Sequence, residues 1–175
     1  MKFEIMYDVS EKDIKQMIAL DKECYFGADV GDFYKCLSWY KKCPQLYTVL
    51  KTNQEIVGYV NFLPITKASY DKIKKGQEKD YELQEKDILP FSKGNNYCLF
   101  MSVVIDKKYR LSKAIIVLLL GLKEKIKNFE ADGIKIRSFV ADCVTGEGEK
   151  LAKHFGGKFL CLTPSGSKIY EFKNI

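Results

Sequence analysis

The sequence predicts a protein of the α/β or α+β class that folds as one domain over residues 1–175. Strand-like runs and helical periodicities alternate along the chain in the order β α α β β β α β α β β. The centre of this order is a buried strand at 97–105, which leads through a short turn into a largely buried helix at 114–129. A strand at 134–141 completes a βαβ unit, so these two strands are expected to be parallel.

The N-terminal residues predict one short strand and two helices. Residues 3–7 have strand character, and Ser10 can cap a helix because an acidic residue follows three positions later. This helix ends before residues 26–32, which are rich in turn formers. A second helix is predicted at 33–41, ahead of a proline that cannot continue it.

A hairpin and a long insertion are predicted in the middle of the chain. The strand signals at 45–51 and 55–64 flank a compact polar connection at 52–54, which is typical of a hairpin. Residues 65–96 then form a charged connection that is unusually long for a compact domain. We interpret it as an inserted, lid-like segment, with a plain surface extension as the equal alternative.

The last part of the chain predicts a strand, a helix and two further strands. Gly133 can end the central helix in a left-handed conformation, and the strand at 134–141 follows it. A short helix at 145–155 and two strands at 158–162 and 168–172 complete the chain.

The turn before the central helix carries the clearest chemical signal. Ser112 can cap the helix. Four cationic residues surround this turn: Lys107, Lys108, Arg110 and Lys113. The first amides of a helix lack partners within it, and the helix dipole adds partial positive charge there. The turn therefore suits a phosphate or pyrophosphate, although a plain helix cap among surface lysines explains the same residues equally well.

Composition and charge argue against several classes of protein. The net charge of +6 comes mostly from dispersed lysines, and it suits an anionic ligand or a plain solvated surface. The sequence has no arginine cluster and no basic stripe with interleaved aromatic residues, which argues against nucleic-acid binding. The six cysteines form no CxxC pair and there is one histidine, so neither a metal site nor a disulfide scaffold is expected. Residues 1–4 show no signal-peptide pattern and no apolar run has membrane-spanning length, so we expect a reduced, cytoplasmic protein without membrane binding.

The same turn resembles the acetyl-coenzyme A motif of the GCN5-related N-acetyltransferases. The segment 105–110, Ile-Asp-Lys-Lys-Tyr-Arg, with the apolar helix after it, is similar to the strand and the Arg/Gln-x-x-Gly-x-Gly/Ala turn of that family. Arg110 matches the first position of the motif, whereas Lys113 and Ile115 stand where the family has glycine or another small residue. If the turn is one residue shorter, the small residues Ser112 and Ala114 take these positions instead. The Ile-Val-Gly that ends at Gly58 is similar to a family strand, and the order of elements matches over essentially the whole chain.

The resemblance implies a mixed, mostly antiparallel sheet of six or seven strands, flanked by about four helices. In this family the fourth and fifth strands splay apart, and the pantetheine arm of the coenzyme lies in the gap. Here these would be the strands at 97–105 and 134–141. The insertion at 65–96 would then be a lid over the mouth of the active site.

The resemblance also implies a set of coenzyme-binding residues. The backbone of Val103 and Ile105 would hydrogen-bond the pantetheine arm as an added strand does. Amides of the turn and of the first helical residues would hold the pyrophosphate: Arg110, Leu111, Ser112, Lys113, Ala114 and Ile115. Thr145 stands where many members have an asparagine that faces the coenzyme. Acetyl-coenzyme A is accordingly the expected cosubstrate, with no metal.

Two catalytic groups that are familiar in this family are missing from the matching positions. Ala152 replaces the tyrosine that often follows the leucine of the closing helix, and Leu99 stands where some members have a glutamate. The candidates that remain, beside water, are Tyr97, Ser102, Tyr59 and Cys143. Core packing explains the two tyrosines better than catalysis does, because buried aromatic side chains usually contribute packing first.

The acceptor would be a primary amine. In relatives the first helical region shapes the acceptor pocket, and Glu23, Asp29 and Asp32 lie there as carboxylates that suit a cationic amine or simply face solvent. The predicted function is acetyl-coenzyme A-dependent N-acetyl transfer to a primary amine, directly within a ternary complex, by a monomer or a homodimer. A noncatalytic module that binds acyl-coenzyme A on the same fold is the alternative, favoured by the missing tyrosine and glycines.

Overall fold

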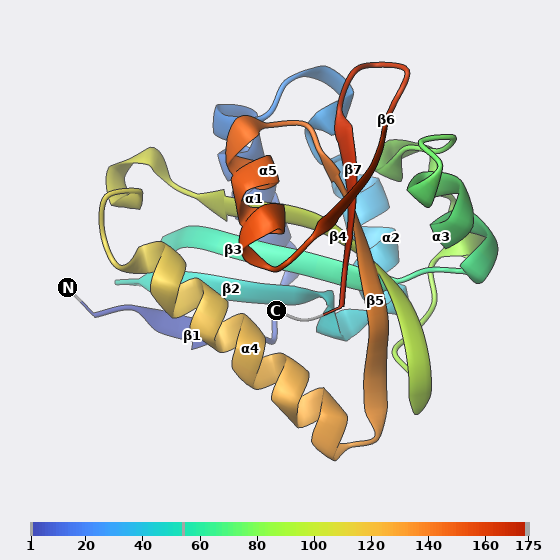
Figure 1. Ribbon diagram of the computed structural model, residues 1–175. Coiled ribbons are helices and arrows are strands. Elements are labelled where there is room, and N and C mark those ends of the chain that lie inside the picture. Colours follow the sequence, from blue (N-terminus) through green and yellow to red (C-terminus); the bar gives the residue numbers. More distant parts are fainter. Residues whose placement is uncertain (1, 54, 174–175) are drawn as a thin grey trace. The chain divides into compact units, whose positions relative to one another are not determined.

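The computed structural model describes residues 2–53 and 55–173. Within these ranges seven strands form one sheet in the order β1-β2-β3-β4-β5-β7-β6, accompanied by five α-helices (Figure 1). The elements are β1 Glu4–Met6, α1 Glu11–Cys24, α2 Phe33–Lys42, β2 Tyr47–Thr52, β3 Glu55–Pro64, α3 Lys67–Lys74, β4 Gly94–Ile105, α4 Ala114–Ala131, β5 Ile134–Cys143, α5 Gly146–His154, β6 Lys158–Leu162 and β7 Lys168–Phe172. The pairs β1–β2, β2–β3, β5–β7 and β6–β7 are antiparallel, whereas β4 and β5 are parallel.

The predicted order of elements and the mixed, mostly antiparallel sheet are confirmed, with small differences in extent. β4 begins at Gly94, three residues before the predicted start, because it pairs with β5 from that residue onward. The fifth α-helix, α3, comes from the insertion and begins after Thr66, whose side chain accepts a hydrogen bond from the amide of Ser69. Gln54, which belongs to the predicted hairpin connection, lies outside the described residues.

Contacts within the chain divide it into two compact units. Unit 1 comprises Met1–Asn61 and Ser102–Asn128, and unit 2 comprises Phe62–Met101 and Phe129–Ile175. The strands β3 and β4 and the helix α4 contribute residues to both units. The predicted coenzyme-binding residues from Val103 onward belong to unit 1, except for Thr145.

Unit 1 has a mainly aliphatic core, and its helix α4 packs on β1 (Figure 1). Its buried side chains include Ile14, Met17, Val49, Leu50, Val60, Leu118 and Leu122. Gly121 allows the close approach of α4 to β1, since a Cβ there would lie 2.8 Å from Ile5 Cδ1. The hydroxyl of Tyr7 donates to Gly121 O at 2.9 Å and fixes the same contact. These contacts determine which face of α4 is buried.

Unit 2 has an aromatic core. Seven phenylalanine rings from its strands, its helices and the insertion meet at centroid distances of 4.5 to 6.4 Å. They are Phe62, Phe91, Phe100, Phe129, Phe139, Phe155 and Phe172. Edge-to-face arrangements dominate, which is the geometry that the ring quadrupoles favour.

The insertion is joined to the rest of unit 2 by buried and partly buried polar contacts. The hydroxyl of Tyr70 on α3 lies 2.7 Å from Ser138 Oγ and donates to Glu171 Oε1 at 2.8 Å. Lys79 Nζ forms an ion pair of 2.5 Å with Asp142 on β5. These bonds anchor the insertion at two places, and its role as a lid stays a prediction.

No helix in the described part of the chain combines the length and the apolar composition that a membrane span requires. Across the same residues, no group of three or more histidine, cysteine or acidic side chains is placed to hold a metal ion. None of the six cysteines forms a disulfide in the described part of the chain.

Candidate functional site

The last residues of β4 present one backbone edge that β3 does not use. The parallel register with β5 ends at Leu99, and β4 continues to Ile105. The amide of Asp106 donates to Val57 O of β3 at 2.8 Å, and the amide of Ser102 donates to Asn61 Oδ1 at 3.0 Å. Because backbone directions alternate along a strand, the peptide groups of the odd-numbered residues 103 and 105 point to the opposite edge.

Gly58 sets the distance between β3 and this part of β4. A Cβ at Gly58 would lie 2.5 Å from Ile105 Cδ1 and 2.7 Å from Val104 O. Both distances are shorter than any ordinary contact, so only glycine permits this approach. In the sequence, Gly58 was noted as the last residue of an Ile-Val-Gly segment that is similar to a family strand. The close approach of β3 and β4 explains why this position is a glycine.

The turn after β4 is built by local hydrogen bonds. Asp106 accepts from the amide of Lys108 through its side chain, at 2.8 Å, and from the amide of Tyr109 through its carbonyl, at 2.8 Å. The Ser112 hydroxyl donates to Tyr109 O at 2.6 Å and accepts from the amide of Ala114 at 3.1 Å. The predicted cap at Ser112 is therefore confirmed, and it starts α4.

The first turn of α4 leaves amides available to a ligand. Within the described residues, the amides of Ile115 and Ile116 have no acceptor, as expected for the beginning of a helix. The helix dipole adds partial positive charge at the same place. Lys107, Lys108 and Lys113 are exposed around it. This arrangement can bind a phosphate or pyrophosphate through backbone amides and lysine side chains.

Arg110 ties the turn to α1. Its Nε donates to Ile105 O at 3.1 Å, and its Nη2 donates to Cys24 Sγ at 3.1 Å. The guanidinium thereby holds the end of β4, while its remaining N–H groups stay available. Leu111, the next residue, is fully exposed.

The predicted acceptor carboxylates differ in their surroundings. Glu23 and Asp29 are exposed. Asp32 accepts a hydrogen bond from the amide of Lys35 at 2.9 Å and caps α2. Two of the three side chains are therefore available to a cationic group, and the third already stabilises a helix end.

A buried carboxylate that the sequence analysis missed lies beside this region. Asp21 on α1 is 5% exposed, and its Oδ1 accepts a hydrogen bond from the hydroxyl of Tyr59 on β3. Its Oδ2 accepts from the amide of Gly31 at 3.3 Å. Burial raises the pKa of Asp21 to about 6, and the two hydrogen bonds oppose that rise. The signal was the helical spacing of Asp21 from Met17, which places it on the buried stripe of α1.

Neighbouring side chains extend this buried cluster. Burial, and next the charge of Asp21, raise the pKa of Tyr59 well above its usual value, so its hydroxyl stays a donor. The ring of Tyr47 lies 6.0 Å from that of Tyr59, and burial raises the pKa of the Cys36 thiol to about 11. Asp21 is thus the member of the cluster whose proton is released nearest neutral pH.

The other predicted residues have separate surroundings in unit 2. The ring of Tyr97 lies 5.0 Å from that of Tyr70, with Lys67 Nζ 5.1 Å from its centroid. Thr145 Oγ1 accepts from the amide of Gly148 at 3.0 Å and caps α5. Burial raises the pKa of Cys143 to about 12, which keeps this thiol protonated.

Comparison with known proteins adds information at the level of structure. No family model and no curated protein sequence matches the chain. The loading GNATL domain of CurA from Lyngbya majuscula is similar with a TM-score of 0.66 and 12% identity, over 99% of this chain and 98% of that one. An N-acetyltransferase from Staphylococcus aureus Mu50 gives 0.61 and 17%, over 99% of both chains. The PaiA N-acetyltransferase from Thermoplasma acidophilum, solved in complex with coenzyme A, gives 0.60 and 15%, also over 99% of both.

These similarities extend over almost the whole length of each chain, although the sequences differ greatly. They agree with the seven-stranded mixed sheet, its parallel β4–β5 pair and the helix that follows β4. The chain therefore has the fold of the GCN5-related N-acetyltransferases.

Proposed function

We propose that this protein is an acetyl-coenzyme A-dependent N-acetyltransferase, which transfers the acetyl group directly to a primary amine in a ternary complex. One observation carries the proposal. The backbone edge of β4 at Val103 and Ile105 leads directly into the α4 N-terminus, where the amides of Ile115 and Ile116 are available. An extended pantetheine arm needs such an edge, and a pyrophosphate needs such a helix end.

The residues of unit 1 suit acetyl-coenzyme A both in their chemistry and in their order, since the strand edge for the pantetheine arm comes directly before the turn for the pyrophosphate. Val103 and Ile105 would bind the pantetheine amides through their backbone. The turn and the first helical residues would bind the pyrophosphate, with Lys113 adding charge. The Thermoplasma acidophilum protein of the same fold binds coenzyme A, which supports this choice of donor.

Bound acetyl-coenzyme A would supply an acetyl group that is activated as a thioester. The chain must hold the acceptor amine in its neutral form beside it and provide a path for protons. Ser102 on β4 and water are the proposed participants in proton transfer, whereas Tyr97 belongs to unit 2 and packs on Tyr70. We assign Tyr59 a positioning role, because its hydroxyl is engaged with Asp21.

A cationic primary amine is the proposed acceptor. The exposed carboxylates of Glu23 and Asp29 would attract it, and Asp32 would support the same region as the cap of α2. An amine that is attracted as a cation must lose a proton before it reacts, so activity is expected to rise as the pH increases toward the pKa of the acceptor.

Release of free thiol from acetyl-coenzyme A tests the proposal. The purified protein is incubated with a polyamine, an aminoglycoside, a peptide with a free N-terminus and a peptide with an internal lysine. Acceptor-dependent thiol release with acetylated product supports an N-acetyltransferase. Binding of acetyl-coenzyme A without turnover across amine classes would favour the noncatalytic module instead, which the missing tyrosine at Ala152 already suggests.

A further inference from the structure

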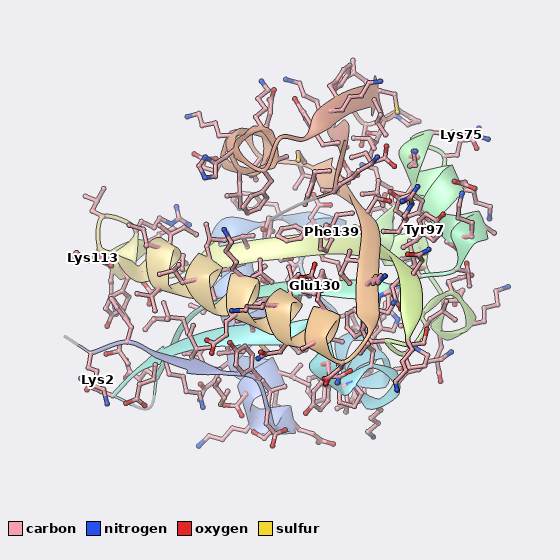
Figure 2. The ribbon with its side chains drawn as sticks, turned by 60° about the horizontal axis from the view of Figure 1, so that its bottom comes forward. Lys2, Lys75, Tyr97, Lys113, Glu130 and Phe139 are labelled. Carbon is pink, nitrogen blue, oxygen red and sulfur yellow. The ribbon has the colours of Figure 1, made fainter. Side chains whose placement is uncertain are left out.

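The outward face of α4 carries apolar side chains among lysines. Five residues at intervals of three and four positions lie on one side of the helix: Lys113, Ile116, Leu120, Lys123 and Lys127. All five are exposed, and Ile116 and Leu120 keep 57% and 61% of their surface accessible. This stripe is about 21 Å long at the rise of an α-helix. Figure 2 labels Lys113 and Glu130 near the two ends of the helix.

The same surface continues into the turn before the helix. Leu111 is fully exposed there, beside Lys107 and Lys108. In the part of the chain that the structure describes, none of the five lysines of this surface forms an ion pair. Three exposed apolar side chains lie among these five lysines, and of the described residues the exposed Glu124 is the one carboxylate beside Leu120 on the same side of the helix, so the surface is net cationic and a candidate contact region. We call the stripe and the three turn residues the α4 face.

We propose that the α4 face docks an acidic carrier protein that presents its acyl group on a phosphopantetheine arm. This inference rests on the proposed function, since it takes the β4 edge as the site for an acyl-pantetheine. Such an arm is attached either to the nucleotide of coenzyme A or to a protein. A carrier protein that donates the acyl group would bind where the nucleotide of coenzyme A would otherwise lie, beside Leu111 and the first turns of α4.

The charge of the α4 face and the burial of the broad apolar side of α4 favour this partner over two others. A second copy of the chain, bound by the same face about a two-fold axis, would place lysines against lysines. A membrane surface requires a broad apolar face on the helix, whereas the broad apolar face of α4 is buried in the protein. An acidic protein surface with a few apolar side chains complements both the lysines and the exposed apolar side chains of the α4 face.

The reaction balances with either donor. The acceptor nitrogen forms a bond to the acyl carbon while the thioester C–S bond breaks. The nitrogen loses one proton, and the released thiolate takes one up. The amine and the acyl-pantetheine are the only reactants that this step consumes.

The test compares two donors and matched variants of the full chain. A purified acidic acyl carrier protein, loaded with acetyl-phosphopantetheine, is titrated against the wild type and against the double variant Lys123→Glu plus Lys127→Glu. The control carries the same charge change on α1 and α2, as Lys12→Glu plus Lys41→Glu, at two exposed lysines of unit 1. We expect the affinity for the carrier to fall about tenfold or more in the α4 variant and to stay unchanged in the control. The KM for acetyl-coenzyme A is expected to change by no more than about twofold in both variants. The substituted lysines are exposed and lie away from the α4 N-terminus, so salt screens their charges from the coenzyme site.

A second variant separates apolar contact from charge. Leu120→Gln keeps every lysine, and we expect it to weaken carrier binding while the KM for acetyl-coenzyme A is retained. If the affinity for the carrier falls equally in the α4 variant and in its control, the α4 face is not the docking site, because a change of net charge anywhere on unit 1 would then weaken binding. The same conclusion follows if the wild type binds vesicles of phosphatidylserine through these lysines and does not bind the carrier.

The two proposals fail in different ways. Acetyl transfer from acetyl-coenzyme A, with neither binding nor use of the loaded carrier, overturns the docking proposal and leaves the proposed function intact. Absence of transfer from both donors overturns the proposed function itself.

Discussion

Tyr59 on β3 donates a hydrogen bond to the buried carboxylate of Asp21 on α1. The amide of Gly31 donates to the second carboxylate oxygen, so one side chain links the helix, the loop after it and the sheet. A Cβ at Gly31 would lie 3.0 Å from Asp21 Oδ2, which shows how closely the loop is packed. The pair therefore holds the segment that carries Asp29, where we propose that the acceptor binds.

The ionisation of Asp21 is expected to make stability depend on pH. Burial raises its pKa from 3.8 to about 6, so the native state binds this proton more tightly than the unfolded state does. The favourable contribution is complete below pH 4 and is lost as the pH rises through 6. Asp21→Asn keeps the shape and removes the titration. Urea unfolding of both proteins at pH 4 and pH 7 should show the wild type losing roughly 2–3 kcal/mol relative to the variant. A constant difference would mean that Asp21 titrates normally.

Tyr59→Phe is expected to loosen the acceptor loop. The substitution removes the donor to Asp21 and leaves a buried carboxylate oxygen without a partner, which costs about 1–3 kcal/mol of stability. With acetyl transfer as the assay, the KM for the amine should rise while kcat changes little. The opposite pattern, a large loss of kcat at unchanged KM together with loss of the basic limb of the pH profile, would make Tyr59 a catalytic acid instead.

Gly58→Ala is expected to disturb the β4 edge. The new methyl group would meet Ile105 Cδ1 at 2.5 Å and the backbone oxygen of Val104 at 2.7 Å, so β4 must shift. We expect a loss of about 1–3 kcal/mol in the free energy of unfolding, measured by urea denaturation, and weaker binding of acetyl-coenzyme A. Gly146→Ala is the stability control, because nothing lies within 4 Å of a Cβ at that position. Equal stability of the two variants would show that the strands separate without cost.

Lys125 on α4 should contribute a second pH dependence, of opposite sign. Its Nζ donates to Tyr47 O and lies 5.5 Å from the centroid of the Tyr7 ring, and burial lowers its pKa from 10.5 to about 7. The native state disfavours the charged form, so this cost is complete below pH 7 and disappears as the pH rises toward 10.5.

Lys125→Met removes that titration while keeping an apolar side chain of similar length. Between pH 7 and pH 9.5 the wild type should gain on the order of 3 kcal/mol relative to the variant, as measured by urea unfolding. A parallel response of the two proteins to pH would show that Lys125 keeps its ordinary pKa in the folded chain.

The elements were predictable because their signals are local. Ser10 caps α1 together with Asp13, as the spacing in the sequence indicated, and Gly133 has a φ of 81° after α4. The cap of α4 at Ser112 was predictable for the same reason. A capping hydroxyl or a glycine at a helix end interacts with backbone groups only a few residues away. Both partners of the cap can therefore be read from the same short stretch of sequence.

The contacts that shape the candidate site were not predictable, because their partners are far apart in the sequence. Asp21 and Tyr59 are separated by 38 residues, and Arg110 and Cys24 by 86. The helical spacing of Asp21 from Met17 could have indicated that it lies on the apolar side of α1, but the spacing contains no information about which donor binds its carboxylate. For Arg110 the sequence indicated a phosphate-binding turn, whereas the side chain also fastens β4 to α1.

Calorimetric titration with acetyl-coenzyme A tests the central claim, that the end of β4 and the start of α4 form the donor site. The wild type is compared with Lys113→Glu, which reverses a charge beside the free amides of α4, and with Lys12→Glu, the same change in the first turn of α1. We predict binding in the micromolar range that weakens about tenfold or more in Lys113→Glu and is retained in Lys12→Glu. No binding by the wild type, or equal affinity in all three proteins, would contradict the account.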